Sequence, residues 1–176
     1  MARLRKACAY RRIERPYTRK SKYKRLQYVR ATPSSKIVRF QSGNLKKDFE
    51  TAVDLFADDS IQLRHNAIES ARLTANRFLE KRLGKQGFRL HIRVFPHHIL
   101  RENPLASGAG ADRMSTGMKK SFGKPIGSAA QIRKGQAIFT AHVDKSNTSL
   151  ASRALKRASY KMPCSGTVIA REHGTR

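Results

Sequence analysis

Apolar residues recur every three or four positions from Ile61 to Leu79, which is the spacing of one face of an α-helix. Gly84 follows this stripe, and glycine readily adopts the left-handed turn that ends many helices. The acids and the hydroxyl of residues 58–60 precede the stripe, where free backbone N–H groups favour them. The pattern therefore predicts a helix over 61–83 with one face packed on a sheet.

A second helix is predicted over 148–162. Ser146 or Asn147 is placed to cap its start, and Pro163 stops it. Its apolar stripe consists of Leu150, Ala151, Ala154, Leu155 and Ala158.

Alternation of apolar and polar residues predicts strands over 88–95 and over 49–57, with a helix over 49–57 as the alternative. Shorter apolar or β-branched runs predict strands over 36–40, 136–143 and 167–170. A Ser-Gly-Asn turn signal follows the first of these runs. Because helices and strands do not alternate as βαβ units, the predicted fold class is α+β, with two helices packed on a mixed, mainly antiparallel sheet.

The charge indicates what such a domain binds. The 176 residues include 38 Lys and Arg against 12 Asp and Glu, which gives a net charge of +26. Residues 1–47 carry +15, residues 48–83 carry −2 and residues 84–176 carry +13. We therefore expect a dense polyanion as partner, such as RNA, DNA or an anionic membrane. No segment has the roughly 20 apolar residues of a membrane span, and we expect no secretory signal.

The first 32 residues are predicted to be a basic arm outside a single domain of 33–176, because their apolar residues are scattered among Arg and Lys. Tyrosine rings interleaved with arginines suit stacking on unpaired bases beside phosphate contacts, which favours RNA over a membrane. The alternative is a solvated tail whose tyrosines pack on the domain. The arm residues predicted to bind RNA are Arg3, Arg5, Lys6, Arg11, Arg12, Arg15, Tyr17, Arg19, Lys20, Lys22, Lys24 and Arg25.

Residues 101–125 form a second segment without the pattern of a core. They are rich in Gly, Ser and Ala, and so long an insert without structure of its own is usually functional or disordered. We expect a long, exposed, flexible loop whose glycines let the backbone approach a partner. Its predicted RNA contacts are Lys119, Lys120 and Lys124.

Enzymatic interpretations find little support in the sequence. Residues 117–124 resemble a phosphate-binding loop, but five residues separate the two glycines, and Pro125 stands where Ser or Thr would hold Mg²⁺. His97 and His98 are adjacent, so in an extended segment they point to opposite faces and cannot jointly hold one metal ion. We therefore expect no catalytic residue, no metal and no cofactor.

Several strings resemble one known family. They are IQLRHNAIESA at 61–71, IRVFPHHILREN at 92–103, AGADR and TGM within 109–118, and FGKP at 122–125. Together they resemble the archaeal and eukaryotic L-ten-e branch of the universal large-subunit ribosomal protein family whose bacterial member is L-sixteen. The likeness extends over almost the whole chain, and the short end after Glu172 resembles the archaeal branch.

This resemblance implies an α/β-hammerhead type of fold and a structural, non-catalytic role in the cytoplasmic ribosome. The implied partners are large-subunit rRNA, neighbouring ribosomal proteins, and tRNA, which the loop would approach near the peptidyl-transferase centre to support tRNA positioning and subunit assembly. The protein would be a monomer within the ribosome. Lys119 departs from a frequent Arg of the family and Pro104 from a common Lys, which leaves the contact at Lys119 open. The residues that match the tRNA-side loop are Arg101, Asn103, Ala109, Gly110, Ala111, Asp112, Arg113, Gly117 and Met118.

Two other classes would also explain the charge: a free RNA or DNA regulator, and an RNA-modifying enzyme with a glycine-rich loop. The sequence shows no helix-turn-helix pattern, zinc spacing or RNP-type aromatic strand for the first class. It shows no convincing cofactor loop or nucleophile for the second. Co-sedimentation with the large subunit in high salt would separate all three classes.

Overall fold

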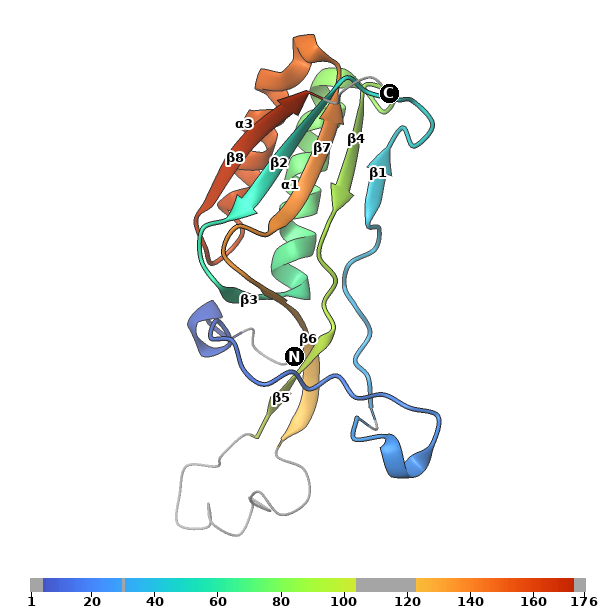
Figure 1. The fold of residues 1–176 in the computed structure, drawn as a ribbon, viewed down its shortest axis with the longest axis vertical. Coiled ribbons are helices and arrows are strands. Elements are labelled where there is room, and N and C mark those ends of the chain that lie inside the picture. The colour runs from blue at the N-terminus through green and yellow to red at the C-terminus, as the bar shows by residue number, and fades with distance from the viewer. Residues whose placement is uncertain (1–4, 30, 104–122, 173–176) are drawn as a thin grey trace.

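The computed structural model describes residues 5–29, 31–103 and 123–172, and within them the strands form two antiparallel sheets (Figure 1). The larger sheet has five strands in the order β1 (Gln41–Gly43), β4 (Phe88–Ile92), β7 (Ala137–Val143), β2 (Thr51–Ala57) and β8 (Gly166–Glu172). The smaller sheet has three strands in the order β3 (Ile61–Arg64), β6 (Lys124–Ile132) and β5 (His98–Glu102). Short 3-10 turns occur at Ala7–Ala9, Lys24–Leu26 and Lys145–Asn147.

Two helices of the described chain, α1 (His65–Leu83) and α3 (Thr148–Ser159), lie side by side on one face of the larger sheet (Figure 1). Alanines recur on their buried faces, and such small side chains let a helix approach its neighbours closely. The α+β class is therefore confirmed, as are the second predicted stripe and the part of the first stripe that lies within α1. The fully buried members of the two stripes are Ile68, Ala71, Ala75 and Leu79 in α1, and Ala151, Ala154, Leu155 and Ala158 in α3.

The ends of the helices match the prediction in part. Gly84 has φ +69° and its N–H donates to the carbonyl oxygen of Glu80 (3.0 Å), as expected for a glycine after a helix. Asn147 precedes α3 but makes no side-chain capping bond. Instead, the Thr148 hydroxyl donates to the carbonyl oxygen of Lys145 (2.8 Å).

The strand predicted over 49–57 is confirmed as β2, which lies between β7 and β8 and is buried on both faces. Its one acid, Asp54, is buried with partners on both neighbouring strands. Oδ1 accepts a hydrogen bond from the Thr140 hydroxyl (2.6 Å), and Oδ2 lies 3.3 Å from Nε of Arg171. The strands predicted over 88–95, 136–143 and 167–170 are likewise present as β4, β7 and β8.

The predicted start of the first helix was wrong. Residues 61–64 are β3, which pairs with β6, and α1 begins only at His65. The polar residues before β3 stabilise a turn rather than a helix end: the Ser60 hydroxyl accepts from the Lys134 N–H (3.0 Å), and Asp58 accepts from the Thr167 hydroxyl (2.7 Å). The first apolar residues of the stripe therefore belong to a strand.

The strand predicted over 36–40 was also misplaced, because only Ile37 and Phe40 of that run face the core, while Val38 is exposed. A spacing of three does not fit the alternation of a strand. Strand pairing begins instead at Gln41 and includes Ser42 and Gly43, the first two residues of the predicted turn. Gly43 ends this strand with φ +91°.

The prediction of a mixed sheet was wrong, since every pairing in the described residues is antiparallel. The connections explain this result. Helix α1 leads from β3 in one sheet to β4 in the other, so it creates no parallel neighbours. Helix α3 joins β7 to β8, but β2 lies between these two strands.

The predicted loop of 101–125 was wrong at both ends, because Arg101 pairs with Pro125 and Glu102 with Lys124 in the β5–β6 ladder. Strand β6 escaped prediction because its sequence, KPIGSAAQI, has few β-branched residues. Hydrogen bonds to β3 on one side and β5 on the other hold this segment as a strand instead. Residues 104–122 lie outside the described residues.

Candidate nucleic-acid interface

The N-terminal arm, described over residues 5–29, crosses the smaller sheet and binds both of its edge strands (Figure 1). On β3, the Gln62 N–H donates to the carbonyl oxygen of Arg11 (2.9 Å). On β5, the Ile99 N–H donates to the carbonyl oxygen of Tyr17 (3.1 Å). Edge strands present unpaired backbone groups, so the arm supplies acceptors that this sheet lacks.

Two glutamines hold the first half of the arm by its backbone. Nε2 of Gln62, a residue only 2% exposed, donates to the carbonyl oxygens of Tyr10 (3.2 Å) and Arg12 (2.6 Å). Nε2 of Gln131 donates to the carbonyl oxygen of Glu14 (2.8 Å) and to Oε1 of Gln62 (3.0 Å). Since a buried amide without partners costs about 1–3 kcal/mol, these bonds tie the arm to the fold.

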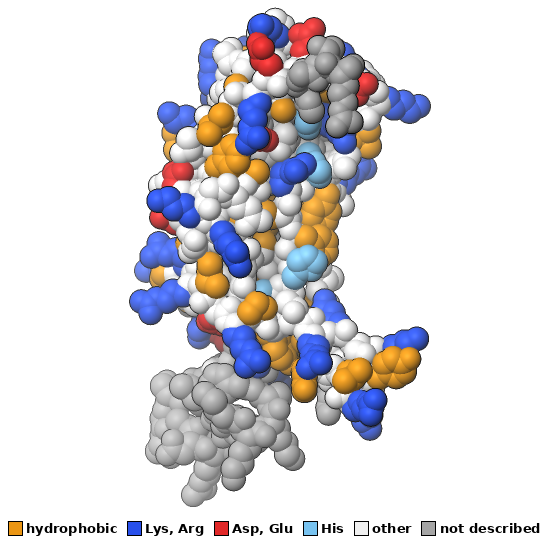
Figure 2. All heavy atoms as spheres, viewed as in Figure 1, with side chains coloured by type: hydrophobic (Ala, Val, Ile, Leu, Met, Phe, Trp, Pro, Cys, Tyr) orange, Lys and Arg blue, Asp and Glu red, His pale blue; other side chains and the backbone are white. Residues whose placement is uncertain are grey.

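The cationic side chains of the arm remain exposed while its backbone is bound. Figure 2 shows Lys and Arg side chains spread over the described part of one face of the molecule, with fewer acids among them. The hydrogen bonds to the domain use the backbone of the arm and not its Lys and Arg side chains. These side chains can therefore contact phosphates while the arm stays bound. The exposed members that the sequence predicted are Arg5, Lys6, Arg11, Arg12, Arg15, Arg19, Lys20, Lys22, Lys24 and Arg25.

Tyr17 is bound on several sides. Its N–H donates to Nδ1 of His98 (2.9 Å), and its hydroxyl donates to the carbonyl oxygen of Tyr28 (2.9 Å). The guanidinium of Arg101 lies 3.9 Å from the centre of its ring, as a cation–π contact. Tyr17 and Arg101, predicted for two different sites, therefore lie together. Burial, the largest cause, and the charge of Arg101 hold the pKa of His98 below its ordinary value, against the opposite effect of Glu14.

The arm also reaches the end of β5 through Arg5. Nε of Arg5 lies 2.6 Å from Oε1 of Glu102, and the carbonyl oxygen of Arg5 accepts from Nη2 of Arg64 (2.9 Å). Because the Arg5 side chain is 54% exposed, this ion pair contributes at most about 1 kcal/mol. It orients Arg5 more than it stabilises the fold.

Residues 19–29 form a closed loop, in which the Val29 N–H donates to the carbonyl oxygen of Arg19 (3.1 Å) and Val29 is buried. Two tyrosines in this loop already have cations over their rings. Arg19 lies 5.1 Å from the ring centre of Tyr28, and Lys22 lies 5.2 Å from that of Tyr23. The part of the alternative prediction in which tyrosines pack on the domain holds for Tyr17, against Arg101, and for Tyr10, against Arg64.

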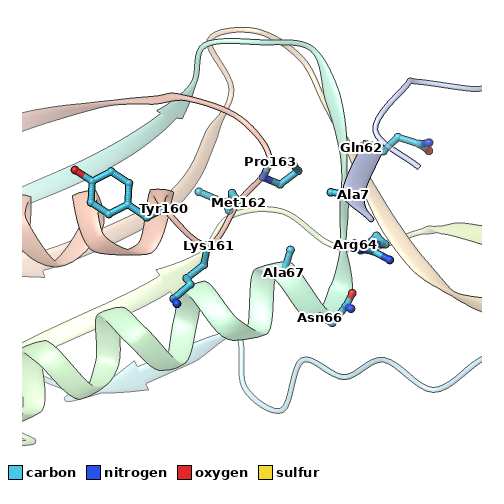
Figure 3. A pocket seen from close by; sticks show the side chains of 9 residues that line it. All are labelled: Ala7, Gln62, Arg64, Asn66, Ala67, Tyr160, Lys161, Met162 and Pro163. Atoms are coloured by element: carbon cyan, nitrogen blue, oxygen red, sulfur yellow. The ribbon is translucent and has the colours of Figure 1, made fainter. Parts of the chain in front are cut away.

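A cavity of about 330 Å³ opens between the arm, the start of α1 and the end of α3 (Figure 3). Its polar lining includes Gln62, Arg64, Asn66 and Lys161, and Tyr160 stands at its side. Among the described residues that line it, none is an acid. The cavity therefore extends the cationic character of the arm onto the domain.

The remaining predicted residues are distributed as follows. Lys124 is exposed at the start of β6, and Asn103 is half-buried directly after β5. Of the tRNA-side set, the described residues thus include only Arg101 and Asn103. The predicted residues outside the described part of the chain are Arg3, Ala109, Gly110, Ala111, Asp112, Arg113, Gly117, Met118, Lys119 and Lys120.

Sequence reasoning missed the residues that hold the arm: Gln62, Gln131 and His98. Gln62 stands between two apolar residues in a segment predicted to be helical, so the pattern gave no reason to single it out. The predicted opposite orientation of the two adjacent histidines is confirmed, since His97 is exposed and His98 is buried. The partners of all three residues are more than 45 positions away in the chain, where local patterns carry no signal.

No three His, Cys, Asp or Glu side chains gather as metal ligands would in residues 5–29, 31–103 and 123–172. No helix in those ranges is long and apolar enough to cross a membrane.

Comparison with known proteins identifies the chain. The large ribosomal subunit protein uL16 of Methanococcus aeolicus is 46% identical over 167 residues, which cover 94% of this chain and 93% of the relative. The protein of the same name from Archaeoglobus fulgidus is 41% identical over 160 residues, covering 91% and 88%. That from Methanocella arvoryzae is 43% identical over 147 residues, covering 84% and 86%. The model of the family "Ribosomal protein L16p/L10e" matches residues 14–169, and the chain therefore belongs to this family of ribosomal proteins.

Proposed function

We propose that this protein is a structural constituent of the large ribosomal subunit and binds large-subunit rRNA through its arm and the basic surface beside it. The observation that carries this proposal is the arrangement of the arm, whose backbone is bound to the smaller sheet while its cations are exposed. The relatives named above are large ribosomal subunit proteins, which supports the same assignment. Neighbouring ribosomal proteins complete its surroundings in the cytoplasmic ribosome, where it is present as one copy.

The second part of the proposal concerns tRNA. We infer from the family resemblance that the segment from Arg101 to Met118 extends toward tRNA near the peptidyl-transferase centre. The stack of Arg101 on Tyr17 supports a role for the arm in this function, because it joins the arm to the strand that leads into the segment. The same resemblance assigns the arrangement of sheets and helices to the α/β-hammerhead type.

Charge removal in the arm tests the rRNA proposal. Replacing Arg11, Arg12 and Arg15 by Gln leaves the backbone bonds of the arm intact, since only carbonyl oxygens of this stretch are used. We expect weaker binding of large-subunit rRNA and a salt dependence that flattens by about 0.7–0.9 in slope for each phosphate that is no longer neutralised. Affinity is measured over a series of salt concentrations, together with co-sedimentation of each variant with the large subunit.

The matched control removes the same charge at the far end of α1, by replacing the exposed Lys81, Arg82 and Lys85 with Gln. We expect a smaller change in slope for this control. Equal slopes for the two triple variants would mean that total charge, and not the arm, sets the affinity. Failure of the unaltered protein to sediment with the subunit in high salt would contradict the rRNA proposal itself.

Replacement of residues 106–113 by a Gly-Ser linker of equal length tests the tRNA proposal. We expect nearly normal incorporation into subunits together with impaired peptide synthesis, because the proposed contact forms only with tRNA. Incorporation and poly-phenylalanine synthesis are measured side by side. Normal values for both would contradict a tRNA-side role, and loss of incorporation would make the segment an rRNA anchor.

A further inference from the structure

Three aromatic rings form a row on the surface beside β4. The rings of Phe40 and Phe95 are stacked, with centroids 5.1 Å apart and planes at 19°. The ring of His97 continues the row, 4.6 Å from Phe95 and tilted by 44°. Phe40 packs against the core, Phe95 is 50% exposed and His97 is exposed, so the row runs from the core out to solvent.

The backbone fixes this row in place. Side chains alternate from Val94 to His98, with the even-numbered ones buried and Phe95 and His97 exposed. The His97 N–H donates to the carbonyl oxygen of Phe95 (3.0 Å), which holds the two rings on the same side. Phe40 is brought beside them by a bond from the Ile92 N–H to its carbonyl oxygen (2.8 Å). An array positioned in this way needs little ordering when it binds a flat ligand.

Cations, and no acids, accompany the rings in both segments that carry them. Arg93 lies two positions before Phe95 and is exposed on the same side, and Arg39 is exposed next to Phe40. The segments 36–43 and 88–98 contain four Lys and Arg residues and no Asp or Glu. Figure 2 shows hydrophobic and histidine side chains next to Lys and Arg on this face. The surroundings therefore suit a flat ligand that carries negative charge.

Three tyrosines of the arm already have a cation over one face of the ring. Cations lie over the rings of Tyr17, Tyr23 and Tyr28. The cation–π pairs found in the described residues include none with Phe40 or Phe95. An exposed aromatic ring beside an arginine is the arrangement that binds an unpaired base with its phosphate.

We propose that the Phe40–Phe95–His97 row is a stacking site for an unpaired RNA base, with Arg93 contacting the phosphate beside it. This proposal rests on the proposed rRNA binding and specifies one of its contacts. The base extends the row at its exposed end, over His97 and the open part of Phe95. Stacking does not depend on salt, whereas the phosphate contact does, so the two contributions can be separated by experiment.

The experiment measures the affinity of transcribed large-subunit rRNA for the full-length protein over a series of salt concentrations. We expect Phe95→Ala to lower the affinity roughly 5- to 150-fold with an unchanged salt slope, since the variant lacks the central ring against which His97 and the base pack. We expect Phe95→Tyr to retain near-normal affinity, because the ring remains. We expect Arg93→Gln to flatten the slope by about 0.7–0.9, because glutamine leaves one phosphate without a cation.

Leu73→Ala is the matched control, because Leu73 is exposed to a similar degree on α1 (52%) and has no aromatic ring. His97→Ala provides a second variant at an exposed position and should also lower the affinity at constant slope. An affinity of Phe95→Ala within twofold of the Leu73→Ala control would overturn the proposal, as would an equal loss in Phe95→Tyr. If the unaltered protein does not bind the rRNA, the proposed function fails; if it binds and only the Phe95 result is negative, the stacking site alone fails.

Discussion

His98 shows how one side chain can join segments that are distant in sequence. It lies on β5, 81 positions from Tyr17, and accepts the backbone N–H of that residue through Nδ1. Only a neutral imidazole with a free lone pair on Nδ1 can do so. The alternation of the chain predicted that His98 and His97 face opposite ways, and this was correct. The partner of His98 was unpredictable, because no local spacing encodes a contact with the arm.

Acid should weaken the docking of the arm. The pKa of His98 lies below its ordinary value near 6.5, mainly because of burial, so the unfolded chain takes up the proton first. The contribution of the bond is therefore full above about pH 6.5 and is lost as the pH falls through the folded pKa. The pKa values of His65 and His91 are shifted in the same direction by burial and add to the same trend.

The measurement compares the free energy of unfolding from about pH 7.5 to about pH 5 in the unaltered protein and in His98→Gln. We expect the substitution to reduce the dependence on pH, since glutamine does not titrate. Equal pH dependence in the two proteins would show that the bond between His98 and the arm does not form in solution.

At the scale of elements, periodicity located the helices and most strands of the larger sheet, because each buries one regular face. It failed where burial is irregular. Strand β3 continues directly into α1, so a strand and a helix share one apolar run. Strand β6 relies on small residues packed by their surroundings: a Cβ at Gly127 would lie 3.3 Å from Nε2 of His65. These elements depend on contacts between residues distant in sequence, and local helix and strand propensities do not reflect such contacts.

The pairing of β1 with β4 should depend on Gly43. Its φ is +91°, and a Cβ there would lie 2.1 Å from the carbonyl oxygen of Phe88. We expect Gly43→Ala to destabilise the protein by roughly 2–5 kcal/mol, from about 1–2 for the left-handed backbone and about 1–3 for the clash. Gly84→Ala is the control, since Gly84 has φ +69° but nothing within 4 Å of the added Cβ. Urea unfolding of both variants checks this; equal losses would show that the clash relaxes away.

At the scale of the whole molecule, charge indicated the class of partner and the strings indicated the family. Neither could show that the arm binds the smaller sheet through its carbonyl groups, since every residue can offer a carbonyl oxygen. The sequence pattern predicted an arm separate from the domain. The bonds to Gln62, Ile99 and His98 instead make the arm and the smaller sheet dependent on each other.

Deletion of residues 1–29 should therefore affect solubility as well as RNA binding. The larger sheet and its two helices keep their contacts, so circular dichroism should retain the helical signal. The edges of β3 and β5 lose the acceptors on the arm, and open edges pair with other chains. We expect self-association in light scattering, whereas the Arg11, Arg12 and Arg15 triple variant stays monomeric. A monomeric deletion variant with an unchanged Tm would contradict the dependence of the smaller sheet on the arm.

The two strand amides bound by the arm also give a direct view of its motion in solution. The N–H groups of Gln62 and Ile99 point out of the smaller sheet toward the carbonyl oxygens of Arg11 and Tyr17. Hydrogen exchange at these two amides becomes fast whenever the arm lifts, even if both sheets stay folded. Comparing the two rates shows whether the arm leaves in one step or peels from one edge first. On mixing with rRNA, the time at which exchange slows at both amides would show when the arm becomes fixed on the sheet during assembly.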